Sequence, residues 1–168
     1  MTLVFGVVTP KTSVISGRST RSPSEVAART LRRMDISSPV IHLSVPVHDL
    51  EAARRFYVDA LGCDPGRMRD DWMDVWFFGL QLTLQLRPGE VRPPAEQGVL
   101  HFGVALSDSA TYVALVDRLG RAGIEWLSPP RPHDAPSLSG KVGGKLADPS
   151  GNVVEIKYYA DPERLRRD

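Results

Sequence analysis

A repeated stretch constrains the fold of this chain more than any other feature of its sequence. His42 lies in an apolar run that ends at Asp49, and the same layout returns 59 positions later with His101 and Asp108. In both copies the aspartate marks a turn, and a helical pattern follows it. An internal repeat of this kind predicts two copies of one supersecondary unit. Histidines at equivalent positions indicate that the two units face each other across a shared site.

The composition is that of an ordinary globular domain. The chain has 168 residues, of which 42% are hydrophobic and 24% charged, enough for a proper core. A net charge of +1, without a basic stripe interleaved with aromatic residues, argues against a nucleic-acid partner. No stretch has the length of a membrane span or the pattern of a signal peptide, so we expect a cytoplasmic protein. The single cysteine, Cys63, is expected to be buried and to serve packing.

The first unit is predicted to span residues 37–87, after a leader at residues 1–36 that is rich in Thr, Ser and Arg. Such a leader rarely packs, although a helix capped by Ser24 and docked on a partner subunit is an alternative. The unit's pattern predicts the following elements. They are a strand at 39–47, a helix at 49–61 between the cap Asp49 and Gly62, a polar loop at 64–71 that could include a short edge strand, and strands at 73–78 and 80–86 joined through Gly79.

The second unit is predicted to span residues 99–160, between a Pro/Gly-rich linker at 88–98 and a charged tail at 161–168. Its pattern repeats that of the first unit, with a long Pro-rich loop inserted. We expect a strand at 99–106, a helix at 109–122, a strand at 124–127, a loop at 128–139, a Gly-rich segment at 140–144, and strands at 145–147 and 153–159. Each unit is therefore β-α-β-β-β, and the fold class is α+β.

Strand alternation indicates which polar side chains share a face. In the second unit Gly103 and Ala105 alternate with large apolar residues and leave a hollow beside His101. The same alternation directs Glu155 to the side of the two histidines. Two imidazoles and one carboxylate match the 2-His-1-carboxylate set of non-haem Fe(II) oxygenases, which leaves open coordination positions. We therefore predict a metal site of His42, His101 and Glu155, although each of these side chains also has an ordinary structural explanation.

Several other residues are candidates for the chemistry around this site. Tyr159 shares the face of Glu155 and could donate a hydrogen bond, and His133 in the Pro-rich loop could act as an acid or base. Trp76 and Phe78 share a face by alternation and could line an apolar cup, while Lys157 could hold an anionic group. Core packing, an exposed loop position and a simple ion pair are the respective structural alternatives. His48 is expected to serve only the turn before Asp49.

The sequence resembles the vicinal oxygen chelate superfamily, the group of glyoxalases, bleomycin-resistance proteins and extradiol dioxygenases. The resemblance is carried by the His-bearing first strand with the segment 49–57 (DLEAARRFY) after it, and by the closing segment 148–156 (DPSGNVVEI). It covers about residues 39–160 and includes the duplicated unit.

The resemblance implies two β-α-β-β-β modules whose curved mixed sheets form a cup around a divalent metal. Carried over by position, the ligands are His42, His101 and Glu155, which bleomycin-binding members generally lack. Glyoxalases add a fourth ligand from the last strand of the first module, near Gln85 here. We therefore expect a dioxygenase-like enzyme with Fe(II), or with Mn, Ni, Co, Zn or Mg, acting on a small molecule that chelates through neighbouring oxygens. A glyoxalase-type isomerase or epimerase and a metal-free drug-binding protein are the alternatives, and family habit favours a homodimer.

Overall fold

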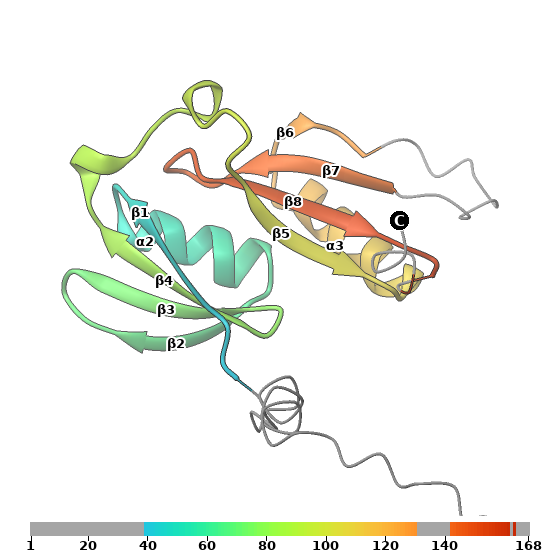
Figure 1. Ribbon diagram of the computed structural model, residues 1–168, viewed down its shortest axis with the longest axis horizontal. Helices are drawn as coiled ribbons and strands as arrows, with labels where there is room; N and C mark the ends of the chain where they lie inside the picture. Colours follow the sequence, from blue (N-terminus) through green and yellow to red (C-terminus); the bar gives the residue numbers. More distant parts are fainter. Residues whose placement is uncertain (1–38, 131–141, 162, 164–168) are drawn as a thin grey trace, which may run out of the picture. The chain divides into compact units, whose positions relative to one another are not determined.

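The structure repeats one four-stranded sheet twice (Figure 1). It is a computed structural model that describes residues 39–130, 142–161 and 163. The predicted leader at residues 1–36, His133 and most of the predicted tail lie outside the described residues. Both sheets belong to one unit, which spans Val40–Asp168.

The first module contains the first sheet, in the strand order β1-β4-β3-β2. β1 pairs with β4 in parallel, and the other neighbours are antiparallel. The elements are β1 (His42–Val47), α2 (Leu50–Arg54), the π-helix η1 (Arg55–Ala60), β2 (Asp64–Met68), β3 (Trp72–Phe77) and β4 (Leu80–Leu86).

The second module has the equivalent order β5-β8-β7-β6, again with the first and last strands parallel. It follows a linker with two 3₁₀ turns, η2 (Pro88–Glu90) and η3 (Pro94–Glu96). Its elements are β5 (Phe102–Leu106), α3 (Ser109–Arg121), β6 (Trp126–Ser128), β7 (Val142–Ala147) and β8 (Val153–Tyr158). The predicted α+β fold of two β-α-β-β-β modules is confirmed.

The repeated aspartates begin the two helices in the same way. Asp49 Oδ1 accepts the backbone N–H of Ala52 at 2.7 Å, and Asp108 Oδ2 accepts that of Thr111 at 2.8 Å. Each bond satisfies one of the free donors at a helix start. The hydrogen bond from Ala52 lowers the pKa of Asp49, and the bonds from Thr111 lower that of Asp108. The predicted cap at Asp49 is therefore confirmed, and its repeat partner plays the same role.

Two predicted elements differ from the structure, and the edge strand allowed for in the loop at 64–71 is confirmed. That strand is β2, which pairs with β3 through an irregular register. The helix predicted at 49–61 is α-helical only to Arg54 and continues as the π-helix η1. The Gly-rich segment at 140–144 is in part strand, because β7 already begins at Val142. A Cβ at Gly144 would overlap the ring of Trp126, so a larger residue there would force the indole or the strand to shift.

The two predicted first strands begin later than expected. β1 starts at His42 and β5 at Phe102, and of the residues before them Ile41 still accepts the backbone N–H of Gln81 in β4 at 2.9 Å. The side chains before both strands are exposed, although the strand pattern predicts a buried face. The exposed fractions are 58% for Val40, 67% for Ile41, 92% for Val99 and 70% for Leu100.

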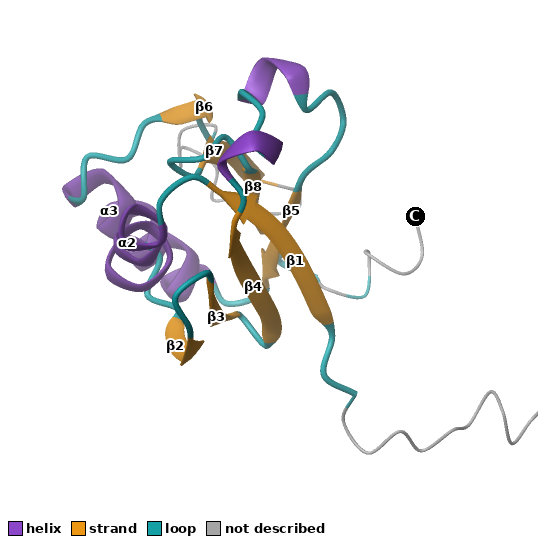
Figure 2. Ribbon diagram, turned by 90° about the vertical axis from the view of Figure 1, so that its left-hand side faces the viewer, coloured by secondary structure: helices purple, strands orange, loops and turns teal. Residues whose placement is uncertain are grey.

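The helices of both modules pack into one common core. Figure 2 shows α2 and α3 on the same side of the strands. Arg118 Nη2 of α3 donates to the carbonyl oxygen of Asp59 in η1 at 2.9 Å. Phe77 and Phe102 meet edge to face across the modules, with 5.4 Å between their ring centres. The core also buries Cys63, and this burial raises the pKa of its thiol to about 12. The opposite faces of both sheets are left open.

The segment 148–152 joins the two modules by hydrogen bonds. Tyr57 donates its buried hydroxyl to Asp148 Oδ2 at 3.0 Å, and Asn152 Nδ2 donates to the carbonyl oxygen of Pro46 at 2.9 Å. Ser150 Oγ accepts the backbone N–H of His48 at 3.0 Å and lies 2.9 Å from its Nδ1. His48 thus does more than serve its own turn, because it ties the end of β1 to the second module.

Candidate metal centre

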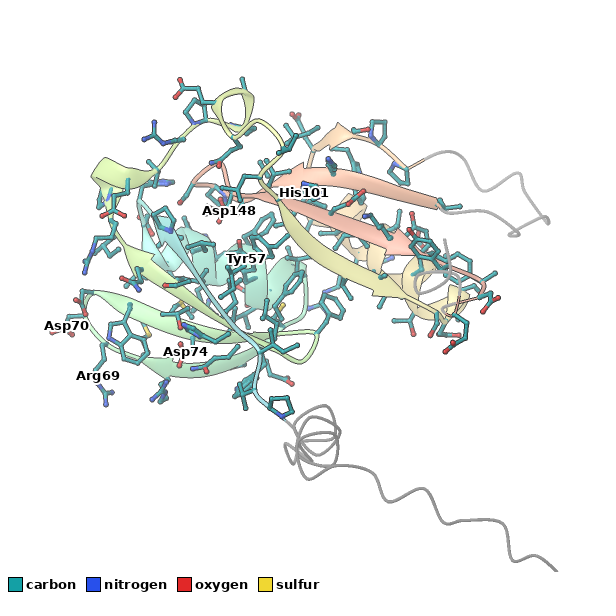
Figure 3. All side chains as sticks on the ribbon, viewed as in Figure 1. Tyr57, Arg69, Asp70, Asp74, His101 and Asp148 are labelled. Atoms are coloured by element: carbon teal, nitrogen blue, oxygen red, sulfur yellow. The ribbon has the colours of Figure 1, made fainter. Side chains whose placement is uncertain are left out.

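Two of the three predicted metal ligands lie together on the open face of the second sheet. His101 Nε2 is 3.1 Å from Glu155 Oε2, and the Glu155 side chain is largely buried. Figure 3 labels His101 at the start of β5. Lys157 Nζ contacts the same oxygen of Glu155. The predicted alternation is confirmed here, since Glu155 and Lys157 of β8 face the same side as the imidazole.

A backbone contact orients the His101 ring. Nδ1 lies 2.7 Å from the carbonyl oxygen of Val99. A carbonyl can only accept, so Nδ1 carries the hydrogen of this contact, and Nε2 is the nitrogen that meets the Glu155 carboxylate, to which it donates when it is also protonated. Metal-binding histidines commonly have their second nitrogen tied to a carbonyl in this way. The ring is therefore held in an orientation that directs Nε2 to Glu155, where a cation could replace the hydrogen between them.

The close approach of β5 to β8 depends on Gly103. Gly103 is the register partner of Glu155, and a Cβ at this glycine would overlap the backbone carbonyl of Glu155. The predicted hollow beside His101 is thus a close backbone contact at this position. This contact fixes the position of the Glu155 backbone in β8, and so the place where the Glu155 carboxylate meets the His101 imidazole.

His42 does not join this pair within the chain. It is exposed at the first position of β1, with Gln81 of β4 as its register partner. Among the described residues, no three His, Cys, Asp or Glu side chains gather closely enough to hold a metal ion. The packing of α2 and α3 into one core explains this, because it holds the modules together from the side opposite to the open faces. The helix packing could not be read from strand alternation.

A hollow separates the first strands of the two modules. Its volume is about 310 Å³, and His101 lines it together with residues of β1 and the linker. Ser44, Pro46, Arg92, Leu100 and Asn152 are among the other residues that line it. Its walls are mostly apolar, and its location next to His101 gives a small molecule access to one side of the imidazole.

The family model of the Glyoxalase/Bleomycin resistance protein/Dioxygenase superfamily matches residues 40–156. The chain belongs to this superfamily. The match covers both modules, from the residues before β1 to the middle of β8. It confirms the family resemblance carried by the opening and closing segments of the sequence.

Solved structures of the superfamily show the same fold. A glyoxalase/bleomycin resistance protein/dioxygenase from Alicyclobacillus acidocaldarius is 30% identical, with a TM-score of 0.66, over 79% of this chain and 98% of that one. A lactoylglutathione lyase from Agrobacterium tumefaciens is 24% identical (TM-score 0.54; 72% and 93% covered). The fosfomycin resistance protein FosX from Listeria monocytogenes is 16% identical (TM-score 0.60; 76% and 98% covered). No functionally curated protein matches the sequence significantly.

The remaining predicted site residues of this superfamily member are dispersed. Trp76 is exposed on β3, but Phe78 lies in the turn after it with a φ of 48°, so strand alternation does not apply to it. The Phe78 ring packs edge to face on Phe77. Tyr159 follows the end of β8, and its backbone N–H bonds to the carbonyl oxygen of Leu106. Gln85 Nε2 donates to Ser44 Oγ at 2.6 Å.

Sequence reasoning missed a polar cluster on the open face of the first sheet. Asp74 of β3 is only 3% exposed, and it accepts hydrogen bonds from Thr83 Oγ1 at 2.6 Å and Gln81 Nε2 at 3.0 Å. Arg67 of β2 donates to it from Nε at 3.0 Å, and Arg67 Nη2 forms an ion pair with the same carboxylate at 2.9 Å. The signal in the sequence is a carboxylate between the apolar residues Met73 and Val75, on the face shared with Trp76.

The hydrogen bonds determine the charge of Asp74. Burial alone raises the pKa of this carboxyl, but the bonds from Thr83, Gln81 and Arg67 and the charge of Arg67 outweigh it. The pKa therefore lies below its ordinary value, and Asp74 is ionised at neutral pH.

No described helix is long and apolar enough to cross a membrane.

Proposed function

We propose that this protein is a divalent-metal-dependent, dioxygenase-like enzyme that acts on a small substrate chelating the metal through neighbouring oxygens. The observation that supports it most is the His101–Glu155 pair, with the ring fixed through Val99 and both donor atoms on an open sheet face. In this proposal His101 and Glu155 bind the ion from one chain, and His42 is the third ligand.

The donor set and its spacing fit a divalent ion. Two adjacent ligands at about 2.1 Å from an octahedral ion lie about 3 Å apart, which agrees with the 3.1 Å between His101 Nε2 and Glu155 Oε2. Imidazole and carboxylate suit Fe(II) best in a site of this type, with Mn, Ni, Co, Zn and Mg as other candidates. Such an ion supplies a Lewis acid and open positions for substrate.

The missing third ligand supports a homodimer in which a second copy contributes His42. The first strand of each sheet is an edge strand, and the residues before both histidines are exposed and apolar. An exposed sheet edge with apolar side chains next to it favours pairing with another chain. In a twofold dimer, each of two sites would take one module from each copy.

The side chains near the pair have separate roles in the proposed reaction. Lys157 beside Glu155 would hold an anionic oxygen of the substrate, and Tyr159 would donate a hydrogen bond to it. Trp76 and Phe78 would provide apolar contacts for the body of the substrate. His133 would move a proton as acid or base.

Two alternatives differ from this proposal in a testable way. In an isomerase or epimerase of the glyoxalase type, Glu155 or Gln85 would also move a proton, and the enzyme would work without O₂. In a metal-free binding protein, the Lys157 ammonium would occupy the position beside Glu155 that a metal ion needs. The ion pair between Lys157 Nζ and Glu155 Oε2 favours this candidate.

Metal analysis of the untagged protein separates these possibilities. We expect about one divalent ion per chain, lost in His42→Ala and in Glu155→Ala, with Thr83→Ala as a folded control. Retention of metal in either ligand variant contradicts the ligand set. Oxygen-electrode traces over a panel of catechols then distinguish an oxygenase, which consumes O₂, from an isomerase.

A mixing experiment tests whether each site spans two copies. Neither His42→Ala nor Glu155→Ala alone should bind metal. After denaturation and joint refolding, half of the dimers combine both chains and regain one intact site, so about a quarter of the wild-type metal should return. No recovery, in a sample shown to contain mixed dimers, contradicts the shared site.

A further inference from the structure

Asp74 and His42 lie on the same open face of the first sheet. The register pairs His42 with Gln81 and Ser44 with Thr83, and across β4 it pairs Thr83 with Asp74. Register partners point to the same face. β3 is two strand spacings, or about 10 Å, from β1. The cluster around Asp74 is therefore part of the surface that carries His42.

This cluster holds one cation in a defined position at the surface. Asp74 is 3% exposed, whereas the Arg67 side chain that it binds is 67% exposed. Arg67 uses Nε and Nη2 for the same oxygen of Asp74, and Nη1 makes no hydrogen bond to any described residue. The outer edge of the guanidinium, formed by Nη1 and Nη2, thus faces solvent. This edge is the one that binds oxyanions through two parallel hydrogen bonds.

An indole supports the guanidinium from the side. Arg67 Cζ lies 5.3 Å from the centre of the Trp72 ring, and Arg69 Cζ lies 6.0 Å from it. Stacking on an aromatic ring restricts an arginine that would otherwise move freely. In Figure 3 Arg69 and Asp70 lie at the outer end of the β2–β3 hairpin, and Asp74 lies farther along the sheet. Only Arg67 is fixed by both the ring and a buried carboxylate.

We propose that Arg67, held by Asp74 and Trp72, binds an oxyanion of the substrate, a carboxylate or phosphonate, away from its chelating oxygens. The inference rests on the proposed function, because it assigns the second end of the same substrate. The cluster also secures β2 against β3, and the oxyanion site adds to that structural role. The substrate class is therefore a small anion whose charged group lies on the order of 10 Å from the pair of oxygens that bind the metal.

The test measures anion binding to the metal-free protein. The probes are benzoate, phenylphosphonate and the neutral analogue benzamide. The binding of each probe is monitored by the change in tryptophan fluorescence of the Trp126→Phe protein. We expect both anions, or one of them, to bind and benzamide not to bind. Arg67→Met should weaken anion binding about 10- to 100-fold, as expected for a charge-assisted pair of hydrogen bonds. Arg69→Met, the matched control over the same ring, should leave it unchanged.

Other outcomes overturn the inference. Equal binding of benzamide, equal loss in the two methionine variants, or no binding to the wild type would each contradict it. Arg67→Lys keeps the charge and serves if Arg67→Met does not fold, and it should bind anions more weakly than wild type. Metal content in the Arg67 variants should equal that of wild type. Normal metal content without anion binding refutes only this inference, whereas anion binding in a protein that never takes up metal refutes only the proposed function.

Discussion

The open faces of the two sheets share one backbone plan and carry different chemistry. In the second module an imidazole faces a carboxylate, His101 and Glu155, at 3.1 Å. In the first module the equivalent histidine has no such partner among the described residues, and the buried carboxylate, Asp74, binds an arginine instead. The two modules thus share the strand order, the helix caps and the histidines, while the residues across the two sheets differ.

The buried carboxylates of the two regions also differ in the sign of their pKa shifts. Hydrogen bonds and Arg67 hold the pKa of Asp74 below its ordinary value. At the junction of the modules, burial raises the pKa of Asp148 despite its bonds from Asn152, Tyr57 and Ser150, and burial also raises that of Tyr57. At Asp74 the hydrogen bonds from Thr83, Gln81 and Arg67, with the charge of Arg67 as the smallest contribution, outweigh burial, whereas at Asp148 burial outweighs the hydrogen bonds.

The largest effect is expected from exchanging equivalent residues between the modules. Ser44 occupies the position in β1 that Gly103 has in β5. Gly103→Ser should displace the Glu155 backbone and weaken metal binding by about 10- to 100-fold, as for other changes that reorient a ligand. Ser44→Gly is the matched control and should leave metal affinity nearly unchanged. Equilibrium dialysis against a metal buffer measures both, and equal losses would contradict the role of this contact.

Removing the charge of Asp74 should destabilise the protein in a pH-dependent way. Asp74→Asn should lower the free energy of unfolding by about 1–3 kcal/mol at pH 7, through lost charge-assisted hydrogen bonds. Because folding lowers the pKa of Asp74, its contribution is complete above the unfolded value of about 3.9 and is lost as the pH falls through the folded value. Urea denaturation at pH 7 and pH 3 should therefore show the two proteins converging in acid.

Asp70→Asn controls for this experiment, because Asp70 is exposed in the turn after β2. It should change the free energy of unfolding by less than about 0.5 kcal/mol. A difference between wild type and Asp74→Asn that stays constant from pH 7 to pH 3 would refute the charge argument.

A smaller effect is expected at the segment 148–152, whose hydrogen bonds join the two modules. Tyr57→Phe removes one buried hydrogen bond to Asp148, which keeps its bonds from Asn152 and Ser150, so the free energy of unfolding should fall by about 1–2 kcal/mol. Tyr159→Phe is the control, since the structure gives its hydroxyl no hydrogen bond to a described residue. Thermal unfolding measures both variants. A Tyr57→Phe protein as stable as wild type would contradict the proposed strength of the junction.

Much of the fold follows from the sequence because its determinants are local. The repeat, the cap at Asp49 and the alternation that places Glu155 beside His101 each depend on a few neighbouring residues. The contacts of His48 with Ser150 and of Arg67 with Asp74 depend on how separate segments pack, which periodicity does not determine. For the same reason alternation predicts the face on which His42 lies, but not which chain or module lies opposite to it.

The buried thiol limits how this protein can respond to oxidants. With a pKa of about 12, Cys63 is almost entirely protonated at neutral pH, and its place in the core keeps reagents away from it. Oxidants that act on thiolates therefore have no target at this cysteine while the protein is folded. Inactivation by mild peroxide, if reversed by added Fe(II), would report on the metal and not on sulfur.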